Sequence, residues 1–115
     1  MQIKKVTDVP AQPVVQEGAQ KVQVRVIFGP RDGAPTFAMR QFEIEPGGAT
    51  PQHQHPFEHE MLVLQGQLTI WTEHGEIPVS AGDAIMVLPG ERHQVRNKSG
   101  GPGKILCLVP VAYQK

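Results

Sequence analysis

Residues 47–66, GGATPQHQHPFEHEMLVLQG, contain three of the five histidines in this chain of 115 residues. In an extended strand, side chains two positions apart project to the same side, so His53 and His55 can present two imidazoles together. His59 begins a run to residue 65 whose apolar content and closing glycine predict a further strand. Neighbouring imidazoles are common ligands of transition metals, and the spacing therefore predicts a metal site.

Alternation along that strand divides its side chains between two faces. One face holds His59, Met61 and Val63, and the other holds Glu60, Leu62 and Leu64. If the first face looks inward, His59 meets the first pair of histidines. Met61 and Val63 would then line the pocket, and Ile85 and Val87 are further candidates for its wall.

The stretch resembles the first signature of the cupin superfamily, Gly-x5-His-x-His-x3-Glu-x6-Gly. Gly47, His53, His55 and Gly66 match it, and His59 stands where most cupins have Glu. The second signature, Gly-x5-Pro-x-Gly-x2-His-x3-Asn, is met further along the chain by Gly82, Gly90, His93 and Asn97, with Leu88 in place of its Pro. The resemblance covers roughly residues 40 to 110.

This resemblance implies a metal site made by His53, His55 and His93, with His59 as a fourth ligand in place of the usual carboxylate. Glu60 is the competitor for that position, but it lies on the opposite face of the strand. The implied cofactor is a divalent transition metal, with Mn or Fe favoured by resemblance. Imidazole also suits Ni, Co, Cu and Zn, so the sequence does not select the metal.

The remaining sequence predicts an all-β fold. Short runs with strand character recur between Gly and Pro residues, and no stretch of ten residues has a helical period. Strands are expected over 21–28, 36–45, 59–65, 67–72, 76–79, 84–88, 93–97 and 104–109. The cupin resemblance narrows this class to a small jelly-roll barrel, or double-stranded β-helix. We expect one barrel domain, 21–115, preceded by an N-terminal arm, 1–20, that contains Pro10 and Pro13.

Composition excludes several kinds of partner. Eleven basic and eleven acidic side chains, without a run of either sign, predict neither nucleic-acid binding nor attraction to an anionic membrane surface. No apolar run has the length of a membrane span, and the first residues lack the apolar core of a signal peptide, so a cytoplasmic location is expected. The single Cys107 lies in an apolar run and is expected to be a buried core residue.

The functional expectation is a metal-dependent enzyme of dioxygenase or decarboxylase type that acts on a small anionic or enolisable molecule. Four neutral imidazoles leave the charge of a bound cation intact, which favours an anionic ligand. A non-catalytic module that binds or senses a small molecule through the metal is the alternative. It remains open because no general acid or base is evident, and Tyr113 belongs to the tail.

Two further questions stay open from the sequence. Arg40 can orient a substrate, but Met39 or Gln41 can face the pocket instead, and Arg92 is expected at the surface. Leu62 and Leu64, with part of the strand around Trp71, form an apolar outer face that the arm can cover within one chain or across a two-fold axis. We expect a homodimer, as is common among cupins.

Overall fold

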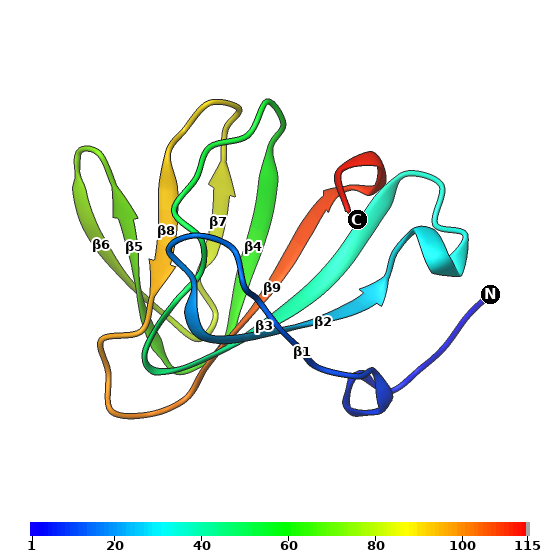
Figure 1. The fold of residues 1–115 in the computed structure, drawn as a ribbon, viewed down its shortest axis with the longest axis horizontal. Coiled ribbons are helices and arrows are strands. Elements are labelled where there is room, and N and C mark those ends of the chain that lie inside the picture. Colours follow the sequence, from blue (N-terminus) through cyan, green and yellow to red (C-terminus); the bar gives the residue numbers. More distant parts are fainter. Residues whose placement is uncertain (115) are drawn as a thin grey trace.

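The computed structural model describes residues 1–114, which fold almost entirely into antiparallel β-strands (Figure 1). The strands are β1 (Gln12–Pro13), β2 (Gln20–Phe28), β3 (Phe37–Ala49), β4 (His59–Gln65), β5 (Gln67–Thr72), β6 (Gly75–Ser80), β7 (Ala84–Val87), β8 (His93–Arg96) and β9 (Gly103–Pro110). Three 3-10 turns accompany them: η1 (Val6–Asp8), η2 (Pro30–Asp32) and η3 (Val111–Tyr113). No helix in this part of the chain is long and apolar enough to cross a membrane.

The strands form one curled sheet in the order β6-β5-β8-β3-β9-β4-β7, and β2 pairs with β3 outside that path. The long strand β3 joins the two parts of the curl. Residues 37–44 of β3 pair with β9, whereas Ala49 at its far end pairs with Arg96 of β8. Strands β4 and β7 continue from β9, and β5 and β6 continue from β8, so the sheet bends around an interior (Figure 1). The prediction of an all-β fold that curls into a barrel is confirmed.

Strand β3 differs most from the sequence prediction, which ended it at residue 45 because of the following Pro-Gly-Gly. The strand continues to Ala49 through a register shift, in which Gln20 pairs with Ala49 and Val22 pairs with Ile44. Gly48 makes this possible, because a Cβ there would lie 2.6 Å from the carbonyl oxygen of Lys21. Glycines in this region therefore form a bulge rather than a chain reversal.

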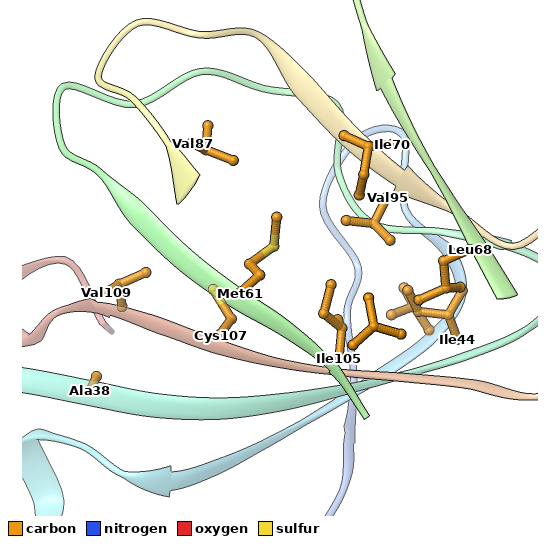
Figure 2. Packing of buried hydrophobic residues seen from close by; sticks show 12 residues of the cluster. Ala38, Ile44, Met61, Leu68, Ile70, Val87, Val95, Ile105, Cys107 and Val109 are labelled. Atoms are coloured by element: carbon orange, nitrogen blue, oxygen red, sulfur yellow. The ribbon is translucent and has the colours of Figure 1, made fainter. Parts of the chain in front are cut away.

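The core lies inside the curl and follows from alternation along each strand. On β9, Gly103, Ile105, Cys107 and Val109 are buried, and the residues between them are partly exposed. Figure 2 shows Cys107 and Met61 pointing from β9 and β4 into the same interior space, with Ile44, Ile105 and Leu68 packed together nearby. Apolar burial of this kind is the main favourable contribution to folding.

Asn97, which matches the last residue of the second signature, ties β3 to the loop between β8 and β9. Its side-chain amide is buried and donates to the carbonyl oxygens of Ile44 and Gly101, at 2.8 and 2.9 Å. Its Oδ1 accepts from the backbone and hydroxyl groups of Ser99. All its hydrogen-bonding groups are thereby satisfied, as a buried amide requires.

The N-terminal arm packs along the barrel. Strand β1 pairs with β2, and the backbone N–H of Val14 donates to the carbonyl of Val22. The division into an arm, 1–20, and a barrel domain, 21–115, stays a prediction. What the arm covers is the open side of the barrel interior, where the histidines lie.

Candidate metal site

Three of the predicted histidines meet inside the barrel. The candidate ligand nitrogens of His53, His55 and His93 all lie within 4.8 Å of one another. His93 is the first residue of β8, and its backbone exchanges two hydrogen bonds with that of His53. The backbone carbonyl of His55 accepts from Gly90 N–H at 2.7 Å. The segment around His53 and His55 is thus held against the start of β8.

His53 and His55 come together by a different route from the one the sequence predicted. Residues 54–58 form no strand, and His53 makes only an isolated bridge with His93. Pro51 and Pro56 lack the N–H groups that a ladder needs, so the segment cannot continue as a strand. The two imidazoles still meet, with ring centroids 3.9 Å apart at an interplanar angle of 63°.

His59 stands beside this group of three. It begins β4 as predicted, is buried, and its ring lies 4.3 Å from that of His55 and 5.2 Å from that of His93, centroid to centroid. It does not belong to the set whose nitrogens are mutually within 4.8 Å. Glu60 is exposed and its neighbours in the ladder are Met86 and Leu108, so the carboxylate competitor lies outside the barrel.

The hydrogen bonds of the imidazoles fit a metal. His93 Nδ1 lies 2.9 Å from the carbonyl oxygen of Glu91, which can only accept, so the proton is on Nδ1 and the lone pair is on Nε2. His55 Nε2 and His59 Nε2 are buried without any hydrogen-bond partner. Buried polar atoms without a partner are costly, and a metal ion would satisfy both nitrogens. The residues present therefore fit a divalent transition metal.

His53, His55 and His59 are held in the neutral form that binds metals. Burial is the main reason that the pKa of His53 is lowered to about 4 and that of His59 to about 3. The pKa of His55 is lowered for the same first reason. Neighbouring imidazoles and the charge of Arg40 lower all three further. At neutral pH these side chains have no proton to lose before they coordinate a cation.

The histidines lie in a cavity of about 520 Å³. Its wall is mostly apolar or aromatic and includes Val14, Phe42, Phe57, Met61, Ile105 and Tyr113. Met61 lines it as predicted, whereas Val63 and Val87 belong to the packed core and Ile85 packs against that core. Among the described residues that line the cavity there is no Asp, Glu or Lys. No acidic side chain of the described wall would therefore offset the positive charge of a cation bound there, as expected from the sequence.

The open question about β3 is answered by the cavity wall. Arg40 and Phe42 line the cavity, so Arg40 is on the inward face. Gln41 is buried on the other side of the strand, where its amide donates to Glu43. Arg92 is exposed, as expected, and lies just before β8, which begins at His93.

Three further residues of the site were missed or misjudged in the sequence. The ring of Phe57 is stacked on His55, with centroids 4.6 Å apart, and on Tyr113, with centroids 4.0 Å apart. Tyr113 thus belongs to the cavity and not merely to the tail. Cys107 is buried as predicted, but its Sγ also lies 3.4 Å from His59 Nδ1. Burial raises the pKa of this thiol, an effect that Arg40 partly offsets, so it stays protonated.

Fold and site together define a class: a small β-barrel protein with a histidine-lined interior suited to a transition metal. The model of the family described as "Cupin domain" matches residues 40–109, and the chain belongs to this family. The matched region begins at Arg40 and ends at Val109, both of which line the cavity.

Two relatives have names connected with polyketides. The polyketide cyclase RemF from Streptomyces resistomycificus is 34% identical, with 96% of this chain and 80% of that chain covered at a TM-score of 0.91. The tetracenomycin polyketide synthase protein TcmJ from Streptomyces glaucescens is 28% identical over 78 residues, which are 67% of this chain and 52% of that protein. The chain thus spans about half the length of this curated relative.

A third similar structure shows the fold alone. It is a predicted oxalate decarboxylase from Thermotoga maritima, 17% identical, with 96% of this chain and 99% of that chain covered at a TM-score of 0.84. The same barrel thus occurs in proteins whose names refer to different chemistry, and function has to be argued from the site.

Proposed function

We propose that the chain is a metal-dependent enzyme that holds a divalent cation through His53, His55, His59 and His93 and cyclises an enolisable polyketide-like molecule. The observation that carries the proposal is the pair of buried, unpartnered Nε2 atoms of His55 and His59 beside the group of three histidines. The names of the two polyketide-related proteins supply the substrate class.

The chemistry that a bound divalent cation would supply is polarisation of a carbonyl oxygen, which acidifies the neighbouring carbon. Mn or Fe remain the favoured metals and Ni, Co, Cu and Zn the alternatives. The protein's own residues bind and orient. Phe42, Phe57 and Tyr113 offer flat apolar surface to a conjugated molecule. The arm residues Val14 and Val15 line the cavity and add apolar surface to it.

The lack of a carboxylate or lysine in the described cavity wall favours cyclisation of an already acidic 1,3-dicarbonyl. Such a molecule gives up its proton to solvent without a dedicated protein base. The same lack supports the alternative of a non-catalytic module that binds a small molecule through the metal. Dioxygenase and decarboxylase chemistry remain candidates for the same site, and one assay separates them.

The first experiment measures metal. The protein, purified without a histidine tag, is reloaded with Mn²⁺, Fe²⁺ or Zn²⁺ and its metal content and affinity are determined beside those of His59→Ala. We expect about one ion per chain, and a loss of affinity in the variant greater than the ~10–100-fold typical of outer-sphere changes, because a direct ligand is removed. His74→Ala is the control, since His74 is exposed on the β5–β6 turn.

The second experiment measures chemistry on a synthetic aromatic poly-β-oxo carboxylic acid, beside a protein-free sample, followed by mass spectrometry. Cyclisation by aldol condensation removes one water, decarboxylation removes carbon dioxide, and dioxygenation adds two oxygen atoms. We expect loss of water with the metal-loaded protein and not with His59→Ala. Full metal binding without any of the three mass changes would favour the binding module, and equal metal content in His59→Ala would refute the four-histidine site.

A further inference from the structure

The only cation among the described side chains of the cavity wall is Arg40, and it has no acidic partner. The ion pairs found within residues 1–114 do not include it, whereas Arg25 pairs with Glu43 at 2.6 Å and Arg96 lies 3.6 Å from Glu76. Arg40 Nε is buried without a hydrogen-bond partner. A guanidinium in a partly dry cavity normally finds a carboxylate or phosphate, so its anion is missing from the protein itself.

The guanidinium is held in place by weak partners. Its Nη2 donates to Cys107 Sγ at 3.2 Å, and its Cζ lies 5.0 Å from the centre of the Phe42 ring. A thiol sulfur is a weak acceptor and an aromatic face is a modest one, so both can orient the group without neutralising it. Neither contact uses Nε, so the guanidinium keeps donors without a partner for a carboxylate.

Arg40 is also close to the histidines. The ladder pairs Arg40 with Cys107 and Cys107 with Met61, which places these three residues in one row across β3, β9 and β4. The single sulfur atom of Cys107 lies between Arg40 Nη2 and His59 Nδ1, at 3.2 and 3.4 Å. A molecule of modest size can therefore reach the histidines with one end and Arg40 with the other.

We propose that Arg40 is the anchor for a carboxylate on the ligand and that the cavity selects conjugated or aromatic carboxylates with a second oxygen for the metal. Such molecules are β-oxo carboxylates or ortho-hydroxy aromatic carboxylates. The carboxylate supplies the charge that the wall lacks, and the rings of Phe42, Phe57 and Tyr113 accept the flat part. The inference rests on the proposed function in that it names the substrate class of the same site.

The test compares salicylate with salicylamide, which has the same size but no charge. Their affinities for the zinc-loaded and the metal-free protein are measured by calorimetry at constant ionic strength, for the parent chain, Arg40→Gln and Arg92→Gln. Arg92→Gln is the matched control, because it removes the same charge from a residue that lies next to His93 but outside the cavity. Metal content is measured in each sample.

We expect Arg40→Gln to weaken salicylate binding on the order of ten- to a hundredfold, as for loss of a charge-assisted hydrogen bond, and to leave salicylamide and zinc binding unchanged. Arg92→Gln should behave like the parent. Salicylate binding that is equal in Arg40→Gln and parent, with zinc still bound, would overturn the anchor while sparing the metal site. Arg40-dependent binding to a protein that takes no zinc would support the anchor and refute the metal.

A second measurement needs no variant and keeps the test valid if Arg40→Gln does not fold. The Nε–H resonance of Arg40 is followed by NMR during titration of the parent protein with salicylate. A buried N–H without an acceptor that gains a carboxylate should shift, whereas salicylamide should leave it in place. No shift at saturating salicylate would overturn the proposal.

Discussion

The protonation of each imidazole decides which of its nitrogens can bind a cation. On His59, a metal at Nε2 requires the proton to be on Nδ1, which lies 3.4 Å from the sulfur of Cys107. On His93, the carbonyl oxygen of Glu91 accepts a hydrogen bond from the Nδ1 proton and leaves Nε2 for a cation. A backbone carbonyl and a thiol thus lie beside the candidate ligands His93 and His59, at positions where metal sites often have a carboxylate. The arrangement keeps negative charge away from the cavity.

The lowered pKa of His53 and His59 predicts that the metal-free protein loses stability on mild acidification. Below about pH 6.5 the unfolded chain binds protons at these side chains. The native chain does so only near pH 4 at His53 and near pH 3 at His59. Because the unfolded state binds more protons in this window, stability rises with pH and falls as the solution becomes acidic. We expect the melting temperature of the metal-free protein to drop between pH 7 and pH 5.

The measurement is a series of thermal melts in chelator, compared with His59→Asn and His74→Asn. The slope of melting temperature against pH should be smaller in His59→Asn than in the parent, because one titrating group is gone, and His74→Asn is the control at an exposed turn. Carboxyl groups with lowered pKa, such as that of Glu43 beside Arg25, act below this pH range and do not interfere. A melting temperature independent of pH between 7 and 5 would contradict the predicted neutral imidazoles.

The turn between β4 and β5 shows how one residue controls the position of an element. Gly66 has φ of +86°, and a Cβ there would lie 2.3 Å from the carbonyl oxygen of Pro102. The strand that begins with His59 therefore ends against the loop before β9, the strand that holds Cys107. Neither a left-handed backbone nor this close approach tolerates another residue easily.

We predict that Gly66→Ala destabilises the fold more than Gly33→Ala. Gly33 also has positive φ, +76°, but a Cβ there would meet nothing within 4 Å. The control variant should lose about 1 kcal/mol from backbone strain alone, and Gly66→Ala an additional ~1–3 kcal/mol from the clash with Pro102. Urea unfolding of both variants measures the difference. Equal losses would show that the Pro102 loop moves aside without cost.

At the scale of the whole molecule, the outer face of β4 stays open. Leu62 and Leu64 are 38% and 42% exposed, and Met86 on the neighbouring strand β7 is 56% exposed. The N-terminal arm pairs with β2 and lines the cavity, so it does not cover them within the chain. Trp71 is half-buried, with the guanidinium of Arg96 5.5 Å from its ring centre. Adjacent exposed apolar side chains favour association.

We predict a homodimer that buries this outer face of β4 and β7. Light scattering coupled to size exclusion should give twice the chain mass of 12.6 kDa, and the double variant Leu62→Glu, Leu64→Glu should give the monomer mass with metal binding retained. Glu73→Gln on the β5–β6 turn is a control away from that face. A monomeric parent protein, or a double variant that remains dimeric, would rule out this interface. The cytoplasmic location stays a prediction as well.

Local regularities were enough to predict the architecture from the sequence. Alternation along 21–28, 59–65 and 104–109, with glycine and proline between the runs, specifies strands because period-two burial is a local property of an extended chain. Spacing within the two cupin signatures singled out the histidines, and the structure brings His53, His55 and His93 together. It also sets His59, and not Glu60, on the inward face.

The composition of the cavity was decided only by tertiary structure. Both faces of β3 hold apolar residues, so alternation could not decide whether Arg40, or instead Met39 or Gln41, faces the pocket. The pairing of β3 with β9 decides which face looks inward. Phe57 and Tyr113 are 56 positions apart and meet because η3 returns to the mouth of the barrel. The sequence by itself determined the strands and the histidine ligand candidates, which depend on local spacing. Contacts between distant strands determined what surrounds them, because such contacts exist only once the sheet has curled.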